Sequence, residues 1–292
     1  MKWTVQKIIS WSQDYLQGKG VENPRLDVEL LLEEVLGISR IRLYTEWDRP
    51  LDEEELKKFK SLLKRRVQRE PLAYILGRRE FYSLGFKVNS AVLVPRPETE
   101  ELVEFALDFL KEKKEEKIKI LDLCTGSGCI LISLLKNLPQ SEGVGIDFLT
   151  EALAVAQENA AAHQVQDRTT WIEADLLQDW PAEILSQKFD LITANPPYIP
   201  ESEWTQLQEE VQFFEPKSAL ISGPHGTDVY AAIFENLKNI LASGALFIGE
   251  MGEEQSKILS SLAHEQLPDI KTSVLKDLSG KERFFLISNS PR

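Results

Sequence analysis

The segment Asn195-Pro196-Pro197-Tyr198 has the residue types needed to hold a planar amino group. It follows an apolar run, 189–194, that predicts a buried strand, and two consecutive prolines must end that strand because they fix φ and have no N–H donors. Asn195 and Pro196 offer an amide oxygen and a carbonyl oxygen that can accept two N–H bonds, while the ring of Tyr198 can stack on the flat group. The simpler alternative is a strand terminator without chemical function.

A glycine turn occurs earlier in the chain, in KILDLCTGSGCI (119–130). This pattern predicts a buried strand, a tight turn and the start of a helix. Gly126 and Gly128 let the backbone turn and approach a ligand closely, because no Cβ stands in the way. Cys124 and Cys129 flank the turn, and we interpret both as small packing residues and not as nucleophiles.

Acidic residues accompany this turn at the ends of the expected strands. Asp147 ends the next strand, nineteen residues after Gly128, where a carboxylate suits the two hydroxyls of a ribose. Asp175 ends the third strand and, with Leu176, is placed to border an adenine. Each acid alone is more simply a helix cap or a loop charge, but their arrangement around one glycine turn predicts a nucleotide-like cofactor.

The spacing by itself does not separate a nicotinamide cofactor from S-adenosylmethionine. Two features favour S-adenosylmethionine. The glycine pattern G-x-G-x-x-G is incomplete, and Asp122 lies just before the turn, where a carboxylate suits a cationic ligand better than a pyrophosphate. Together with the acceptors after residue 194, this predicts methyl transfer to a weakly nucleophilic nitrogen by positioning and electrostatic stabilisation, without a covalent enzyme intermediate.

These groups need a scaffold, and from residue 118 the sequence alternates between strand and helix patterns. The predicted strands are 118–123, 143–147, 169–174, 189–194, 245–250, 271–276 and 282–287. Amphipathic helices fit between most of them, for example at 151–163 and 228–241. Such alternation predicts a mainly parallel sheet covered on both faces. The last two strands are joined by a connection too short for a parallel crossover, so the final strand should run antiparallel to its neighbours.

The first 80 residues have helical patterns instead. One helix is expected over Pro24–Leu36, and a second is capped by Asp52 and ended by Pro71. Short β segments follow between 79 and 94. A further helix is expected to begin within PRPETE (95–100).

Charge is divided unevenly along the 292 residues, whose formal net charge is −13. Residues 1–85 carry 16 Lys and Arg against 14 Asp and Glu, whereas the remainder carries 18 against 33. Nucleic-acid binding usually leaves a basic footprint, so this distribution argues against direct nucleic-acid binding by the acidic remainder. Five arginines lie within the first part, and they form either a recognition surface for a protein or a solvated helix face: Arg65, Arg66, Arg69, Arg78 and Arg79.

The two cysteines and three histidines are too few for a disulfide framework or a four-ligand zinc site, so we expect no metal. A reducing cytoplasm fits this composition. The sequence has no apolar run near the ~18 residues that span a membrane, and its first residues do not have the pattern of a secretory signal.

Seven segments, in this order, resemble one family over nearly the whole chain. They are EPLAYILGRREFYSLGFKVN (70–89), VLVPRPETEELVE (92–104), LDLCTGSGCI (121–130), FDLITANPPYIP (189–200), FEPKSALISGPHGTDVY (214–230), GEMGEEQ (249–255) and KDLSGKERF (276–284). Together they resemble the release-factor glutamine methyltransferases, the PrmC/HemK family. The NPPY segment alone is shared with nucleic-acid aminomethyltransferases, but PRPETE and the EFY-to-KVN segment are not.

The resemblance implies a Rossmann-like S-adenosylmethionine-dependent methyltransferase fold in three parts. These are a helical substrate-recognition domain over 1–78, a β-hairpin linker over 79–94 and a methyltransferase domain over 95–292. The implied reaction is N5-methylation of the glutamine in the Gly-Gly-Gln loop of peptide-chain release factors, which tunes translation termination. We expect a cytoplasmic monomer.

The resemblance also implies roles for individual residues. The cofactor would be contacted by Cys124, Thr125, Gly126, Ser127, Gly128, Asp147 and Asn195, and bordered by Asp175 and Leu176. The substrate glutamine would be held by Asn195, Pro196, Pro197 and Tyr198, of which Asn195, Pro196 and Tyr198 are the expected catalytic residues. The family usually has Gly at the position of Cys124 and Leu at the position of Thr227.

Two other functions compete with this one. A nucleic-acid aminomethyltransferase, acting on adenine N6 or guanine N2, should have a basic target-recognition region, which the charge distribution lacks. A noncatalytic binding module of the same fold should have lost either the glycine turn or the NPPY acceptors, and this sequence has both.

Overall fold

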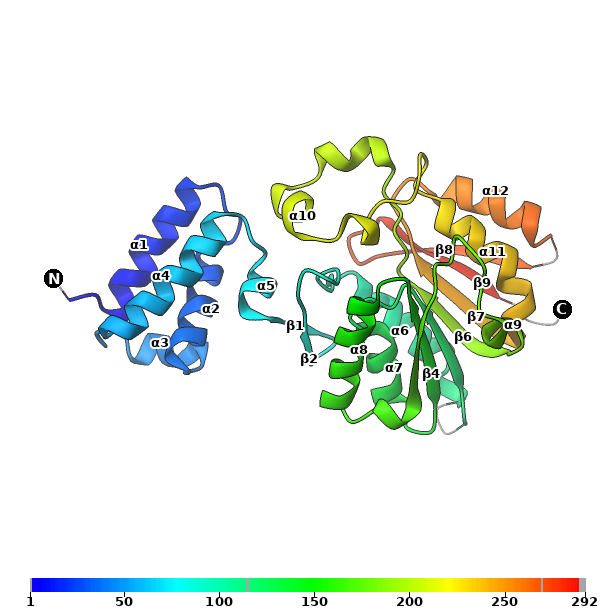
Figure 1. Cartoon of the computed structure of the whole chain (residues 1–292), viewed down its shortest axis with the longest axis horizontal. Helices are drawn as coiled ribbons and strands as arrows, with labels where there is room; N and C mark the ends of the chain where they lie inside the picture. Colours follow the sequence, from blue (N-terminus) through cyan, green and yellow to red (C-terminus); the bar gives the residue numbers. More distant parts are fainter. Residues whose placement is uncertain (1, 114–115, 269, 289–292) are drawn as a thin grey trace. The chain divides into compact units, whose positions relative to one another are not determined.

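The computed structural model describes residues 2–113, 116–268 and 270–288. The chain divides into two compact units (Figure 1). The helical unit comprises residues 1–77 together with 208–214, and the sheet unit comprises residues 78–207 and 215–292. The boundaries that we expected at 78 and 94 stay predictions. The later segment 208–214, which returns to the first unit, was not anticipated.

The helical unit is built around the apolar faces of its helices. Its first 77 residues contain α1 (Val5–Gly18), α2 (Pro24–Leu36), α3 (Arg40–Thr45), α4 (Glu53–Val67) and α5 (Leu72–Leu76). Asp52 and Glu55 form the predicted capping box at the start of α4. The helix ends at Val67 and not at Pro71, because the chain leaves helical geometry at Arg69, whose φ is +68°. Pro71 instead caps α5.

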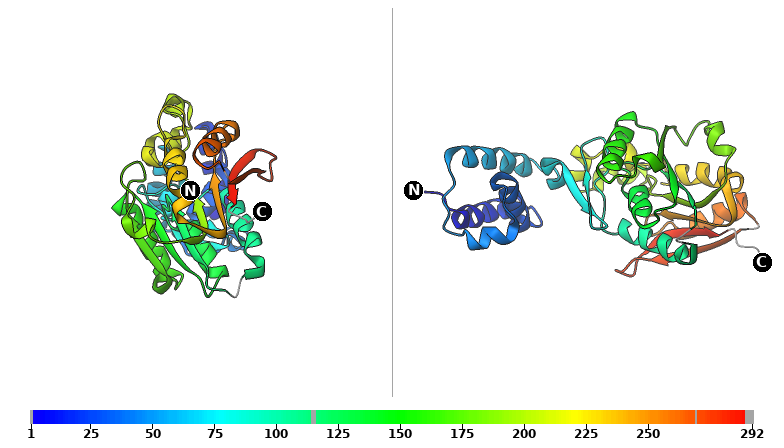
Figure 2. Two further views of the ribbon diagram at one scale, coloured as in Figure 1. Left: turned by 90° about the vertical axis from the view of Figure 1, so that its right-hand side faces the viewer. Right: turned by 90° about the horizontal axis from the view of Figure 1, so that it is seen from below.

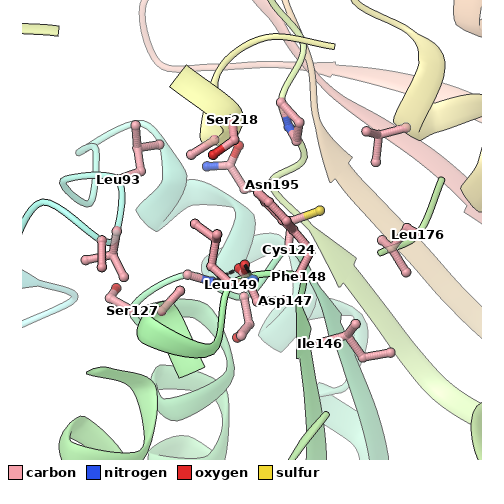
Figure 3. A pocket seen from close by; sticks show the side chains of 18 of the residues that line it. Leu93, Cys124, Ser127, Ile146, Asp147, Phe148, Leu149, Leu176, Asn195 and Ser218 are labelled. Carbon is pink, nitrogen blue, oxygen red and sulfur yellow. Dashed lines mark hydrogen bonds between the residues drawn. The ribbon is translucent and has the colours of Figure 1, made fainter. Parts of the chain in front are cut away.

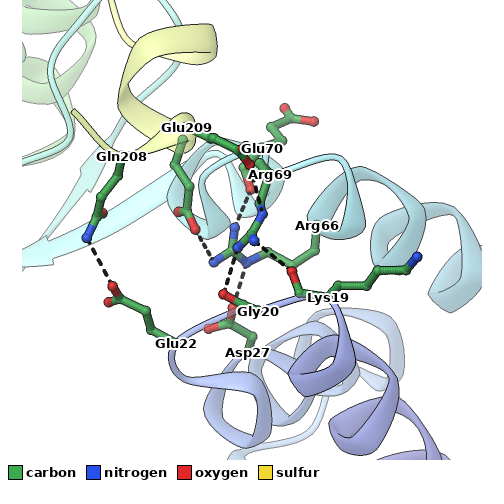
Figure 4. Close-up of polar contacts among 10 residues, drawn as sticks. Lys19, Gly20, Glu22, Asp27, Arg66, Arg69, Glu70, Gln208 and Glu209 are labelled. Carbon is green, nitrogen blue, oxygen red and sulfur yellow. Dashed lines mark hydrogen bonds and ion pairs between the residues drawn. The ribbon is translucent and has the colours of Figure 1, made fainter. Parts of the chain in front are cut away.

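The arginines at the end of α4 bind within the helical unit (Figure 4). The side chain of Arg66 is buried, with its Nε 2.6 Å from Asp27 Oδ2 and its Nη2 2.8 Å from Glu210 Oε1. Arg69 donates to two backbone carbonyls of the α1–α2 connection and pairs with Glu209 at 3.4 Å. Glu209 and Glu210 begin α10 (Glu209–Phe214), so this helix is anchored on the helical unit. Because Arg66 is buried, it belongs neither to a solvated helix face nor to an exposed recognition surface, the two alternatives that the sequence left open.

A β-hairpin opens the sheet unit, with β1 (Arg78–Phe81) antiparallel to β2 (Leu84–Lys87). Tyr82 and Ser83 form its turn with φ values of +50° and +59°, the left-handed backbone that a two-residue hairpin turn needs. The buried side chain of Asn159 accepts from the Lys87 N–H at 2.7 Å and donates to the Ser127 carbonyl at 2.9 Å. The hairpin is thereby tied to the glycine turn.

Seven strands form the central sheet of the described residues, in the order β5-β4-β3-β6-β7-β9-β8. They are β3 (Lys119–Leu123), β4 (Glu142–Asp147), β5 (Thr169–Glu173), β6 (Phe189–Ala194), β7 (Leu241–Glu250), β8 (Lys271–Lys276) and β9 (Glu282–Ser288). The predicted parallel sheet is confirmed, and so is the antiparallel last strand, because β9 pairs antiparallel with both β7 and β8. Strand β7 begins four residues earlier than the apolar pattern indicated, through an irregular pairing with β6.

Helices cover both faces of this sheet (Figures 1 and 2). One face packs against α6 (Thr99–Phe109), α7 (Cys129–Asn137) and α8 (Thr150–Ala162), together with the aromatic residues of the hairpin. The other face packs against α9 (Ala182–Leu185), α11 (Asp228–Ile240) and α12 (Ser256–Gln266). Two apolar cores therefore hold the sheet rigidly between them.

The order of the strands reverses between β3 and β6. These two strands are paired so that Leu123 lies beside Ala194, at their carboxyl ends. The glycine turn that follows β3 and the NPPY segment that follows β6 therefore leave the sheet side by side, at the point where open α/β sheets bind ligands. Of the helices in the described part of the chain, none is long and apolar enough to cross a membrane.

Candidate active site

A cavity of about 280 Å³ opens at these carboxyl ends (Figure 3). Its walls include nine of the residues that the sequence singled out, together with several that it did not. The expected ones are Cys124, Thr125, Gly126, Ser127, Asp147, Asp175, Leu176, Asn195 and Pro197. The described residues that line the cavity do not include Gly128, Pro196 or Tyr198. The fold thus brings the two sequence motifs together around one cavity.

The glycine turn has left-handed backbone at three positions. Cys124, Gly126 and Gly128 have φ values of +57°, +53° and +77°. A Cβ at Gly126 would have no atom of the described residues within 4 Å, so its backbone faces the open cavity. A Cβ at Gly128 would instead lie 3.0–3.2 Å from Ile132, Trp171 and Ala156, so that glycine lets α7 pack on the sheet. The cofactor contact expected for Gly128 stays a prediction.

Asp122 lies beneath the turn and not in the cavity wall. Its carboxylate is fully buried and accepts hydrogen bonds from the hydroxyls of Thr125 at 2.6 Å and Thr193 at 2.7 Å. Burial raises the pKa of Asp122 to about 6, although the two hydroxyl donors oppose that shift. Asp122 therefore fixes the shape of the turn through Thr125, whereas the sequence had suggested that it faces a cation.

Asp147 and Asp175 both line the cavity and both shape local backbone. Asp147 accepts from the Gly126 N–H at 2.9 Å and the Leu149 N–H at 3.1 Å, one on each carboxylate oxygen. Burial raises its pKa, and these backbone donors oppose the rise. Asp175 accepts from the Leu177 N–H at 3.0 Å. Each carboxylate oxygen has a second lone pair, so both acids can still accept from a ligand.

Asn195 and Pro197 of the NPPY segment line the same cavity as the glycine turn. Asn195 Nδ2 donates to Thr99 Oγ1 at 3.3 Å, and among the described residues no donor is bonded to Asn195 Oδ1 or to the Pro196 carbonyl. The Tyr198 hydroxyl donates to Glu250 Oε1 at 3.2 Å, and burial together with that carboxylate raises the pKa of Tyr198. The Tyr198 carbonyl accepts from Gln255 Nε2 at 2.8 Å, which holds the segment in place.

Sequence reasoning missed three further residues at the site. Thr99 begins α6 and lines the cavity, and Glu250 ends β7 as a buried carboxylate behind it. Phe148 lines the cavity next to Asp147 and is 43% exposed. Thr99 and Glu250 stand in PRPETE and GEMGEEQ, two segments that carried the family resemblance without an assigned role.

The residues present suit S-adenosylmethionine. Gly126 leaves room for a close approach to the backbone, and the carboxylate of Asp147 suits a ribose. Leu176 and Phe148 offer apolar surface suited to an adenine, and the cavity-lining carboxylates of Asp147 and Asp175 suit a positively charged ligand. Most of the cavity wall is apolar with a few polar groups, as in other small-molecule sites.

Known proteins match both parts of the chain. Residues 7–77 match the PrmC N-terminal domain, and residues 102–221 match the methyltransferase small domain. The release factor glutamine methyltransferase of Rhodopirellula baltica is 38% identical over 283 residues, which cover 96% of this chain and 95% of its own length. The enzyme of the same name from Geobacter sulfurreducens is 42% identical over 255 residues, covering 87% and 86%.

The fold also has a solved relative. The hMettl16 catalytic domain superposes with a TM-score of 0.57 at 14% identity, covering 78% of this chain and 81% of its own. At that identity the likeness shows the methyltransferase fold alone. The full-length relatives are far more similar, and they include both the helical unit and the sheet unit. On this evidence the chain belongs to the release factor glutamine methyltransferase family.

Proposed function

We propose that this protein transfers a methyl group from S-adenosylmethionine to the side-chain nitrogen of a glutamine in peptide-chain release factors, at the Gly-Gly-Gln loop. One observation carries the proposal beyond family membership. Two adjacent acceptors, Asn195 Oδ1 and the Pro196 carbonyl, have no donor among the described residues, and Asn195 lines the same cavity as the glycine turn. A carboxamide –NH2 group has the two N–H donors that such a pair requires.

The glycine turn would hold the cofactor. S-adenosylmethionine, when bound, supplies a methyl group activated by a positively charged sulfonium. Gly126 and Ser127 would border its methionine part, and Asp147 would accept from its ribose hydroxyls. Leu176 and Asp175 would border its adenine. Cys124 and Thr125 complete this wall of the cavity, with Thr125 held by Asp122.

The NPPY segment would hold and activate the glutamine. A carboxamide nitrogen is a poor nucleophile because its lone pair is delocalised into the carbonyl group. Asn195 and Pro196, accepting from its two N–H bonds, would favour the positive charge that develops on nitrogen as it is methylated. Pro197 fixes the course of the loop, and the ring of Tyr198 would stack on the carboxamide. A strong general base is not required for this chemistry.

The helical unit would recognise the release factor. Its first 77 residues match the PrmC N-terminal domain almost completely. The arginines of α4 are bound by Asp27, Glu70, Glu209 and Glu210, so recognition would use other residues of this unit. The expected compartment is the cytoplasm, where translation terminates, and the expected oligomeric state is a monomer.

Methyl transfer from labelled S-adenosylmethionine tests the proposal. Purified release factors and DNA are incubated with the enzyme in parallel, and mass spectrometry locates the added methyl group. We expect a single methyl on the glutamine of the Gly-Gly-Gln loop and none on DNA. Label in adenine or guanine, with unmodified release factor, would instead identify a nucleic-acid aminomethyltransferase.

A further inference from the structure

Three polar side chains from distant parts of the sequence form a continuous hydrogen-bonded chain behind the cavity. Asn195 Nδ2 donates to Thr99 Oγ1 at 3.3 Å, and the same Thr99 hydroxyl donates to Glu250 Oε2 at 2.6 Å. Thr99 and Glu250 are only 2% and 3% exposed. The contact between Thr99 and Glu250 is thus shielded from bulk water, where such a bond is strongest.

The hydrogen bonds of this series all point the same way, with each group donating toward Glu250. Glu250 accepts on both carboxylate oxygens, from Thr99 on Oε2 and from Tyr198 on Oε1, so the Thr99 hydroxyl donates its single hydrogen to Glu250. The hydroxyl oxygen can then only accept from the next group. Asn195 must therefore present its NH2 group to Thr99 and turn its carbonyl oxygen away. Without this constraint, the two ends of the amide could exchange places at little cost in shape.

Several neighbouring groups hold Glu250, the final acceptor of this hydrogen-bonded series. Burial raises its pKa, but the Thr99 hydroxyl, the positive charge of Arg283 and the Tyr198 hydroxyl oppose the rise, while Glu98 adds to it. The Tyr230 hydroxyl donates to the backbone carbonyl of Glu250 at 2.5 Å and fixes the end of β7.

The Thr99 hydroxyl is not used as an ordinary helix cap. The cap position of α6 is Glu98, which makes no side-chain capping bond in the described structure. The hydroxyl of Thr99 instead reaches across to another element, β7, 151 residues later in the sequence. A purely local role in starting the helix does not explain that geometry.

We propose that Thr99 and Glu250 are positioning residues that orient the amide of Asn195, so that its Oδ1 faces the nitrogen to be methylated. This inference rests on the proposed function, because it assigns Asn195 to the substrate carboxamide. Neither residue needs to touch the substrate, since both act through Asn195.

The first test is Thr99→Val, which keeps the shape of the side chain and removes the hydroxyl. With release factor as substrate, we expect kcat to fall about 10-fold to 100-fold, the loss seen when a group that orients a ligand-contacting side chain is removed. KM and the affinity for S-adenosylmethionine, measured by calorimetry, should change less than about threefold. Thr99→Ser should restore most of the rate, because it restores the hydroxyl.

A matched control exists in the same unit. Thr150 also begins a helix, α8, and its hydroxyl donates to Glu173 at 2.6 Å, but the pair is exposed and neither residue lines the cavity. Thr150→Val should leave kcat unchanged. If Thr99→Val does not bind S-adenosylmethionine, Glu250→Gln is used in its place to test whether Asn195 is oriented through this hydrogen-bonded series. Its amide can present either end to Thr99, so kcat should fall, though less than in Thr99→Val.

The decisive comparison repeats Thr99→Val in an Asn195→Ala background. A residue that acts through Asn195 should have no further effect there. An equal loss of kcat in both backgrounds would overturn the inference, and so would a kcat within twofold of wild type for Thr99→Val while Asn195→Ala is strongly impaired. Failure of the wild-type protein to methylate any release factor would reject the proposed function itself, which keeps the two failures distinguishable.

Discussion

The two units bury carboxylates in contrasting ways. In the helical unit, Asp27 is buried against the guanidinium of Arg66, which also binds Glu210. Burial raises the pKa of Asp27, and the hydrogen bond and charge of Arg66 oppose that rise, while the charge of Glu210 adds to it. Burial disfavours the charged form of Arg66, but its hydrogen bonds to Glu210 and Asp27 raise its pKa. Each buried charge there has an opposite charge in direct contact.

In the sheet unit, three buried carboxylates at or near the cavity are held by neutral donors, whereas a fourth, Glu215, pairs with Arg96 at 2.6 Å. Asp122 and Glu250 accept from hydroxyl groups, and Asp147 accepts from backbone N–H groups. None of the ion pairs found among the described residues includes these three acids. Burial is the largest influence on each of them and raises its pKa.

This difference distinguishes charges that hold the fold together from charges that orient groups at the cavity. A buried ion pair satisfies itself and holds two segments together, as Arg66 holds α2 and α10. A carboxylate held by hydroxyls and backbone N–H groups orients the groups that donate to it, as Asp122 orients Thr125 and Glu250 orients Thr99. Perturbed carboxylates that gather around one cavity are typical of active sites.

Arg66→Leu should have the largest effect and should confine it to the helical unit. It leaves Asp27 buried without a partner, so the free energy of unfolding of this unit should fall by about 3–5 kcal/mol. Hydrogen-exchange mass spectrometry would localise the loss of protection to α2 and α4. Arg42→Leu is the control, because the Arg42–Glu46 pair is on the surface and should contribute less than about 1 kcal/mol. Equal effects would show that the buried cluster contributes no more to stability than a surface ion pair.

Gly126→Val should weaken S-adenosylmethionine binding by about 100-fold, equivalent to about 2.7 kcal/mol. The branched side chain projects into the open cavity, and the φ of +53° strains any residue with a Cβ. Calorimetry measures the affinity directly.

Gly244→Val distinguishes obstruction of the cavity from backbone strain. Gly244 has a φ of +71° and open space around its Cβ position, but it does not line the cavity. Its substitution should strain the backbone similarly and leave the affinity unchanged. A similar loss of affinity in both variants would contradict the placement of the cofactor at the turn.

Asp122→Asn tests whether a buried carboxylate without an ion pair changes the pH dependence of the free energy of unfolding. The folded-state pKa of about 6 is above the ordinary value of 3.8, so the folded protein binds more protons than the unfolded chain between these values. The stability of the wild-type protein should therefore lose about 2 kcal/mol from this group as the pH rises from 4 to 6. The variant, compared with wild type by urea unfolding, should lack that loss.

For Asp277, the contribution to stability should depend on pH in the opposite direction, and Asp277→Asn tests this. The Ser279 hydroxyl is the largest influence on Asp277, and with the Lys281 N–H and Arg283 it lowers the pKa of that carboxyl to about 2. Its contribution to stability is present above pH 3.8 and is lost as the pH falls toward 2. Wild type and variant should therefore differ most at neutral pH and converge in acid. If both aspartates changed stability with pH in the same direction, the opposite pKa shifts given for them would be contradicted.

The cysteines should show the smallest effect, which is an absence of reaction. Burial raises the pKa of Cys129 to about 12, and burial with the nearby carboxylates raises that of Cys124 well above its ordinary value. Because the thiolate is the reactive form, iodoacetamide at pH 8 should label neither residue in the folded protein, whereas both should react in urea. Rapid labelling of Cys124 in the folded state, detected by intact mass, would show that its surroundings are less apolar than the structure indicates.

Local patterns predicted most of the sheet unit. The strands, the glycine turn and the end of β6 at two prolines each depend on neighbouring residues, so sequence reasoning identified them and placed them at one edge of the sheet. Cys124 shows the limit of such patterns, since its left-handed backbone became apparent only in the structure.

Contacts between distant segments were not predictable. Thr99 and Glu250 meet 151 residues apart, and Arg66 binds Glu210 across 144 residues. Nothing in the spacing of either pair indicates the contact, because it exists only after the sheet and helices have packed. The helical unit was recognised as helical, but α10, which follows β6 in sequence, could not be assigned to it from periodicity.

The rate of methyl transfer by Asn195→Ala tests the central claim most directly. With saturating S-adenosylmethionine and release factor, a single-turnover experiment measures the chemical step, and calorimetry measures cofactor affinity on the same variant. If Asn195 stabilises the transition state, the rate should fall about 10²–10³-fold while affinity changes less than about threefold. A near-normal rate would contradict the account, because the NPPY segment would then only terminate β6.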